Sequence, residues 1–134
     1  MSDPLSITVS KLRRMDPVSF LASVENGEPR LRAMTHYIDD GGAIWYPSLK
    51  RCGKINQVKK TPTVAVCFYD STGQLAPQTF YGRAQIIEDT EIAKRIYANF
   101  EPSIRTIVPA LPGSDNFVFI KITAETAVLN RYET

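Results

Sequence analysis

A serine followed by three cations stands near the middle of the chain. Ser48 can donate a hydrogen bond, and Lys50, Arg51 and Lys54 can supply charge-assisted ones. The segment from Gly41 to Tyr69 contains five Lys and Arg residues and no Asp or Glu. This combination is typical of a phosphate site, although the same cations also occur on the solvated face of a surface helix. We therefore keep both interpretations at this point.

Arg32 is the second candidate, because it lies in the middle of a predicted strand where an apolar residue is usual. Alternation along a strand puts Arg30, Arg32, Met34 and His36 on one side and the intervening residues on the other. An arginine in such a place either faces solvent or binds an anion with two hydrogen bonds. His36 has no Ser, Cys or carboxylate partner motif near it, so we assign it no catalytic role.

The elements around these residues predict a mainly β domain with a few helices. We expect strands at 18–24, 30–38, 43–46, 63–69, 78–87, 117–123 and 126–132, and helices at 6–15, 48–60 and from Asp89 or Thr90 to about 100. Asn26-Gly27 is typical of a hairpin turn, and Gly82 indicates a bulge or a close backbone approach. The apolar run 63–69 predicts a strand buried on both faces, and the prolines of 101–115 predict a loop.

Composition limits the classes of function. The chain has 134 residues, which fits a single domain, and its net charge of +2 is too small to indicate a nucleic-acid partner. No apolar run is long enough for a signal peptide or a membrane helix, so we expect a cytoplasmic protein that does not enter a membrane. Two cysteines and one histidine predict neither a disulfide framework nor a zinc site.

Aromatic residues and cysteines provide weaker candidates. The side chains of Trp45, Tyr46, Phe80 and Tyr81 could flank a planar ligand, but aromatic residues in strands more often belong to a core or an interface. Cys67 is most simply a small buried apolar residue.

The order and spacing of several motifs resemble the pyridoxamine 5'-phosphate oxidase-like family, including its general-stress-protein branch. The motifs are FLASVENGEPRLRAM, then IWYPSLKRCGKINQVKKTPTVAVCF, then FYGRAQII, and together they cover about residues 18 to 88. The resemblance implies an antiparallel split β-barrel of six to seven strands. It also implies a homodimer with FMN at the interface between the subunits.

The resemblance also implies roles for individual residues. Arg32, Ser48 and Lys54 would hold the FMN phosphate, and the backbone of Ala33, Met34 and Thr35 would contact the isoalloxazine. Cys52-Gly53-Lys54 stands where the family often has Ser-Arg-Lys, so the second cation must come from Lys50 or Arg51. Gln78 stands near the position of the glutamine that contacts the flavin from the next strand, shifted by one residue.

These implications lead to several functional hypotheses. The first is an FMN-dependent oxidoreductase with an unknown small-molecule substrate and no assigned catalytic residue. The alternatives are a flavin carrier or redox sensor without turnover, a relative that binds the deazaflavin F420, and a barrel without a cofactor. Haem ranks last because His36 is the single histidine. The C-terminal VLNRYET has no clear counterpart of the oxidase's Trp and Arg pattern, so we do not expect pyridoxamine phosphate oxidase activity.

Overall fold

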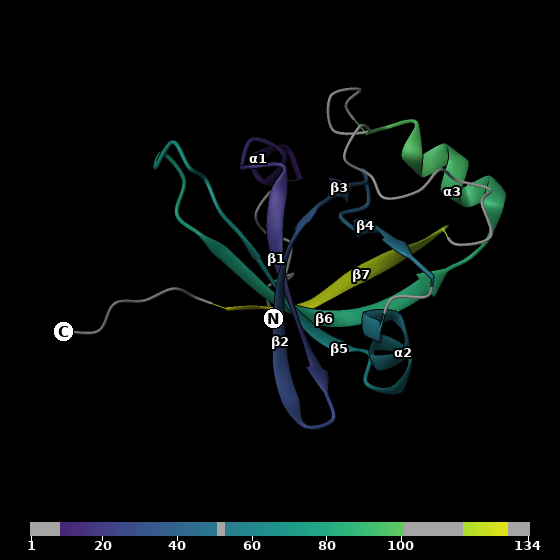
Figure 1. Cartoon of the computed structure of the whole chain (residues 1–134). Coiled ribbons are helices and arrows are strands. Elements are labelled where there is room, and N and C mark those ends of the chain that lie inside the picture. The colour runs from purple at the N-terminus through teal and green to yellow at the C-terminus, as the bar shows by residue number, and fades with distance from the viewer. Residues whose placement is uncertain (1–8, 51–52, 101–116, 129–134) are drawn as a thin grey trace.

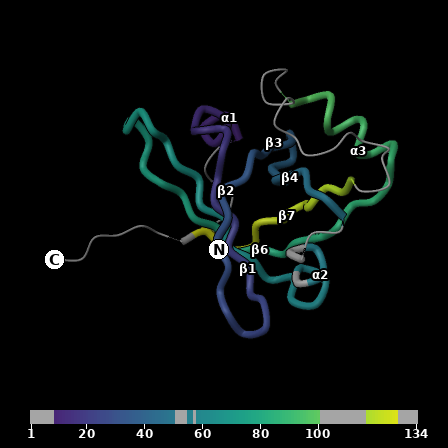
Figure 2. Tube along the Cα trace, viewed as in Figure 1, coloured from purple at the N-terminus to yellow at the C-terminus, as the bar shows by residue number. Residues whose placement is uncertain are grey.

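The computed structural model describes residues 9–50, 53–100 and 117–128. Seven strands form one antiparallel sheet in the order β2-β1-β5-β6-β7-β4-β3. The strands are β1 Val18–Glu25, β2 Glu28–Thr35, β3 Tyr37–Ile38, β4 Ile44–Leu49, β5 Thr63–Phe68, β6 Gln78–Ile87 and β7 Phe117–Val128. The helices are α1 Val9–Arg13, α2 Gly53–Lys60 and α3 Thr90–Tyr97. The sheet curls strongly (Figures 1 and 2), so the predicted mainly β, split-barrel fold is confirmed.

The first hairpin forms as its turn sequence predicts. Asn26 and Gly27 both have positive φ, 51° and 80°, and they connect Glu25 directly to Glu28 in the strand register. A two-residue turn with two positive φ values matches the twist of the flanking strands. This turn therefore sets the register of β1 against β2.

The chain crosses from one edge of the curled sheet to the other where it passes from β2 to β3. These strands follow each other in the sequence but lie at opposite edges of the sheet. The single strand expected at 30–38 is therefore two strands, separated at His36. The backbone N–H of His36 donates to the carbonyl oxygen of Pro17 at 3.0 Å, one step beyond the Val18–Thr35 pair that ends the β1–β2 ladder.

The core fills the inside of the curled sheet. Alternate residues of each strand point inward, and Tyr46, Phe68, Phe80 and Ile120 are among the largest fully buried side chains. α2 closes this core with Ile55 and Val58, and α1 adds Leu12. The expectation that β5 is buried on both faces was wrong. Its burial alternates, because no second layer covers its outer face within the described part of the chain.

β6 and β7 form a long pair with an irregularity at Gly82. The register shifts between Tyr81 and Gly82, which confirms the predicted bulge. A Cβ at Gly82 would meet the backbone carbonyl oxygen of Thr123, which also confirms the predicted close approach of another backbone segment to Gly82. The two strands expected at 117–123 and 126–132 are one strand as far as Val128. Residues 129–132, like the predicted loop 101–115, lie outside the described residues.

α3 packs on the outer face of the sheet, opposite the barrel core. Asp89 caps it, since its side chain accepts hydrogen bonds from the backbone N–H groups of Glu91 and Ile92 at 2.9 and 3.1 Å. Ala93 and Ile96 then pack in a second apolar cluster with Trp45 and Phe119. None of the helices in the described part of the chain has the length and apolar character needed to cross a membrane.

Candidate functional site: a buried serine and a partly exposed arginine on the inner face of the barrel

Ser48 lies in β4 and points into the barrel. The helix expected to begin at Ser48 begins only at Gly53, so Ser48 is a strand residue and not a helix cap. It is 1% exposed, and its Oγ has no hydrogen-bond partner in the described part of the chain. A buried hydroxyl without a partner is costly, and a bound oxygen acceptor would relieve that cost.

Arg32 lies in β2 and reaches over the inner face of β1. Its Nη1 donates to Ser23 Oγ at 3.3 Å, and its Nη2 lies 3.8 Å from Glu25 Oε2. Its side chain is 28% exposed, whereas the neighbouring Leu31 is 71% exposed. Arg32 therefore lies on the inner face of the sheet beside Leu21 and is partly exposed, whereas Leu31 faces outward.

The residues expected to contact a flavin ring lie at the end of β2. Ala33 is exposed, Thr35 is half-buried, and Met34 is half-buried against the barrel core. Among the described strands, β2 is an edge strand of the sheet and pairs only with β1. Every second backbone amide and carbonyl of an edge strand has no strand partner, so the Ala33–Thr35 backbone can bind a ligand there.

The basic segment after Ser48 is only partly described. The Nζ atom of Lys50 lies 3.0 Å from Glu88 Oε1, so Lys50 contacts the end of β6. This hydrogen bond and the charge of Lys50 lower the pKa of Glu88, with a further contribution from Lys59. Arg51 and the side chain of Lys54 lie outside the described residues, although the backbone of Lys54 belongs to the first turn of α2.

Gln78 begins β6 and is half-buried. Its Nε2 donates to the carbonyl oxygen of Ala76 at 3.0 Å. Its role as a flavin contact stays a prediction.

A buried hydrogen-bond network not anticipated from the sequence lies beside this site. Ser19 Oγ lies 2.8 Å from His36 Nδ1 and 2.5 Å from the Tyr46 hydroxyl. The three residues come from β1, the β2–β3 junction and β4, so the network joins the two ends of the open sheet. Burial lowers the pKa of His36 to about 4 and raises the pKa of Tyr46 above its usual range. His36 is therefore neutral near pH 7.

The alternation of inward and outward residues along β1 could have indicated this network from the sequence. Ser19 and Ser23 occupy inward positions of β1, where apolar residues are usual, and inward serines need partners. No grouping of three or more His, Cys, Asp and Glu side chains that could hold a metal occurs in the described ranges.

The other aromatic candidates and Cys67 are placed as follows. Tyr46 and Phe80 belong to the barrel core, and Trp45 belongs to the outer cluster under α3. Tyr81 is exposed on the outer face of the sheet. Cys67 is half-buried on the same outer face, not buried as expected.

The family model for pyridoxamine 5'-phosphate oxidase matches residues 7–130, which is most of the chain. No curated protein sequence matches the chain.

Solved structures with the same fold agree with this match. A Listeria innocua protein described as a pyridoxamine 5'-phosphate oxidase is 31% identical, with a TM-score of 0.71, over 87% of this chain and 90% of that one. General Stress Protein 26 from Bacillus anthracis is 20% identical, with a TM-score of 0.72, over 89% and 88% of the two chains. An F420 reductase is 20% identical, with a TM-score of 0.69, over 89% and 94%. The chain therefore belongs to the pyridoxamine 5'-phosphate oxidase family.

Proposed function

We propose that this protein binds FMN and is a flavin-dependent oxidoreductase with a small-molecule substrate. The observation that carries the proposal is the buried Ser48 hydroxyl, which has no partner in the described part of the chain. A phosphate oxygen would accept its hydrogen bond, and the positively charged segment directly after β4 would attract the anion. The residues present therefore fit a flavin phosphate.

Three side chains would hold the phosphate in this proposal. Ser48 donates from β4, and Arg32 approaches from β2, which contacts β4. The Arg32 guanidinium is available, because its contact with Glu25 is long at 3.8 Å. Lys54 is the third of these side chains, and Lys50 or Arg51 would supply the second cation of the segment. Each charge-assisted hydrogen bond of this kind contributes on the order of 1.5–3 kcal/mol.

The free edge of β2 would seat the flavin ring. The backbone of Ala33, Met34 and Thr35 would donate to and accept from the ring, and Gln78 would add a side-chain contact. When bound, the flavin supplies the electron transfer, so the protein's own task is binding and orientation. The buried network of Ser19, His36 and Tyr46 stabilises this seat, since His36 directly follows Thr35.

We also propose that the protein is a cytoplasmic homodimer. The outer face of β1, β2 and β6 exposes four large apolar side chains: Phe20, Val24, Leu31 and Tyr81. Leu31 and Tyr81 lie in one row across the sheet, with Ala22 and Ala65 between them. A continuous apolar surface of this kind favours contact with a protein partner. A second copy of the chain can cover it, because a two-fold axis brings the same surface of both subunits together.

FMN titration of matched variants tests the cofactor site. Replacing both Arg32 and Lys54 with alanine removes two charge-assisted contacts, so the dissociation constant should rise roughly 100- to 10,000-fold. Lys60→Ala, at the exposed end of α2, serves as the control and should bind like the wild type. Unchanged affinity in the Arg32→Ala/Lys54→Ala variant would refute the assignment.

Turnover separates the enzyme from a flavin carrier or redox sensor. If the protein is an enzyme, a nicotinamide cofactor should reduce the bound flavin and an electron acceptor should reoxidise it, over many cycles. A flavin that binds but does not cycle with any donor and acceptor would favour the carrier.

F420 is the second candidate cofactor, because a similar structure is an F420 reductase. A parallel titration with F420 decides between the two cofactors.

A further inference from the structure

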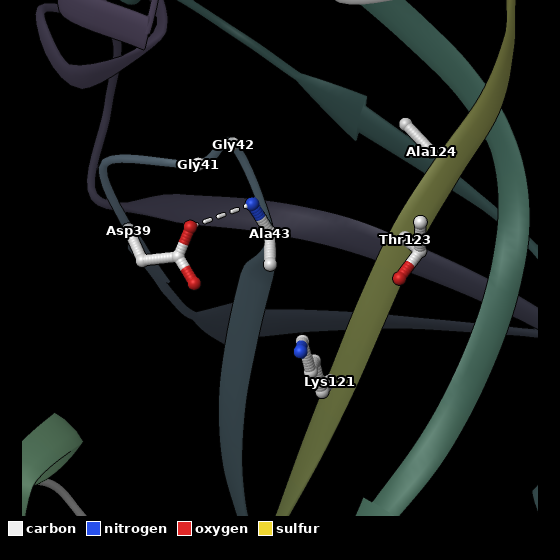
Figure 3. Close-up of a pocket in the computed structure, with 7 residues that line it drawn as sticks. All are labelled: Asp39, Gly41, Gly42, Ala43, Lys121, Thr123 and Ala124. Atoms are coloured by element: carbon white, nitrogen blue, oxygen red, sulfur yellow. Dashed lines mark hydrogen bonds between the residues drawn. The ribbon is translucent and has the colours of Figure 1, made fainter.

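Glu25 is a carboxylate shared between two arginines, in contrast to the carboxylate of Asp39. In the hollow of about 270 Å³ beside the β3–β4 turn, Asp39 Oδ1 accepts a hydrogen bond from the Ala43 N–H at 2.9 Å (Figure 3). Asp39 Oδ2 accepts one from Trp45 Nε1, also at 2.9 Å, so both oxygens serve this turn. Glu25 instead brings a single oxygen, Oε2, near the guanidinium groups of Arg30 and Arg32.

The register of the first hairpin explains how Glu25 reaches both arginines. Arg30 is the diagonal neighbour of Glu25 across the hairpin, two residues nearer the turn than Arg32. Arg32 is paired with Leu21, yet its guanidinium contacts Ser23 and lies near Glu25, which are both nearer the turn. The side chain of Arg32 therefore extends along the strands toward the hairpin turn.

Arg30 is the nearer partner of Glu25. Arg30 Nε lies 3.2 Å from Glu25 Oε2, whereas Arg32 Nη2 lies 3.8 Å from the same oxygen. Because the attraction between two charges falls with distance, the Arg30 contact is the stronger of the two. The other contact of the Arg32 side chain with a described residue is the 3.3 Å hydrogen bond to Ser23 Oγ. A guanidinium has five N–H donors, so Arg32 keeps donors for a further acceptor.

We propose that Glu25 and Arg30 are positioning residues that regulate the binding of the flavin phosphate by Arg32. In the flavin-free protein, Glu25 draws the Arg32 guanidinium toward the hairpin turn and competes with the phosphate for it. When Arg32 binds the phosphate, Arg30 retains Glu25, so the carboxylate keeps a partner. The presence of a phosphate at Arg32 rests on the proposed function.

The two positioning residues should change FMN affinity in opposite directions. Glu25→Gln removes the competing charge, so the dissociation constant of FMN should fall roughly two- to fivefold, as expected for a partly exposed ion pair. Arg30→Gln leaves Glu25 to Arg32 and should raise the dissociation constant by a similar factor. In the Glu25→Gln background, Arg30→Gln should have little effect, because no carboxylate remains for Arg30 to retain.

Matched controls separate these contacts from a general effect of charge. Glu28 is paired with Glu25 in the hairpin register and forms no ion pair with another described residue. Glu28→Gln makes the same change of charge and should bind FMN as the wild type does. Arg30→Lys keeps the positive charge and should bind FMN nearly as well as the wild type. Riboflavin has no phosphate, so its affinity should be the same in all these variants.

Four results would overturn the proposal. They are unchanged FMN affinity in Glu25→Gln, weaker FMN binding by Glu25→Gln, an equal effect of Glu28→Gln, and an Arg30→Gln effect that is as large without Glu25 as with it.

A parallel titration with inorganic phosphate, followed by the NMR signals of β2, separates this inference from the flavin proposal. If the wild type rejects FMN but phosphate binding shows the same pattern among the variants, the flavin proposal is refuted and this inference stands. If FMN binds the wild type and its affinity does not respond to Glu25→Gln, the flavin proposal stands and this inference is refuted. A protein that binds neither FMN nor phosphate would refute both.

Discussion

Replacing Ser48 with alanine should have opposite effects on the flavin-free and the flavin-bound protein. In the flavin-free protein the Ser48 hydroxyl is buried without a partner in the described part of the chain. Alanine removes that hydroxyl and leaves the rest of β4 unchanged. In the proposed complex with FMN, the same substitution would remove a hydrogen bond to the phosphate.

The two magnitudes follow from the burial of Ser48, which is 1% exposed. A buried hydroxyl without a partner costs roughly 1–3 kcal/mol, and the small void left by its oxygen offsets part of that gain. We expect the free energy of unfolding of the flavin-free variant to rise by about 1 kcal/mol. A hydrogen bond to a charged group contributes about 1.5–3 kcal/mol, so the dissociation constant of FMN should rise about 10- to 150-fold.

Urea unfolding of the flavin-free protein and FMN titration measure the two effects. Ser19→Ala is the matched control, because Ser19 is equally buried but bonds both His36 and Tyr46. Its loss leaves two buried groups without their partner, which costs roughly 1–3 kcal/mol each. The same chemical change should therefore stabilise the protein at Ser48 and destabilise it at Ser19.

Two outcomes would refute this reasoning. If Ser48→Ala destabilised the flavin-free protein as Ser19→Ala does, the Ser48 hydroxyl would have a partner, and its position would say nothing about an anion. If FMN affinity did not change, the phosphate would lie elsewhere.

Three further predictions concern the assembly, the buried histidine and the bulge. Leu31→Glu should convert the proposed dimer to a monomer in light scattering, whereas Lys94→Glu should not; a dimer in both would place the interface elsewhere. Burial lowers the pKa of His36 from 6.5 to about 4, so the unfolded chain takes up a proton before the folded one as pH falls. The contribution of His36 to the free energy of unfolding should be fully present above pH 6.5 and should fall by roughly 3 kcal/mol as the pH approaches 4. Urea unfolding at several pH values measures this fall, which should be absent in His36→Gln. Gly82→Ala should destabilise the fold by about 1–3 kcal/mol or more in thermal unfolding, because its Cβ meets the Thr123 carbonyl; an unchanged midpoint would contradict the close approach.

The strands were predictable from the sequence because local signals set them. The Asn26-Gly27 turn, the limits of β6 and the cap at Asp89 follow from residue types that favour one backbone conformation. The predicted strand limits were wrong where pairing between segments far apart in the sequence determines the backbone path. His36 interrupts a regular alternating strand because the chain must cross from one sheet edge to the other.

The side of each strand that faces the core was predicted less well. The sequence left open whether Arg32 faces solvent, and the structure shows its side chain 28% exposed on the inner face, whereas the apolar Leu31 is 71% exposed. Under the proposed function, the apolar outer face would contact a second copy of the chain and the polar inner positions would contact an anion, which would explain why polarity and burial do not follow their usual relation here. The hydrogen bonds of Ser19 and the isolation of Ser48 depend on strand packing and could not be read from spacing alone.

The most direct test of the central claim is a visible absorption spectrum of the purified, untagged protein, taken before and after addition of excess FMN and gel filtration. We predict that flavin bands stay with the protein at close to one flavin per chain. A colourless protein that rejects FMN would contradict the claim. In that case a repeat with F420 would distinguish a deazaflavin protein from a barrel that binds neither cofactor.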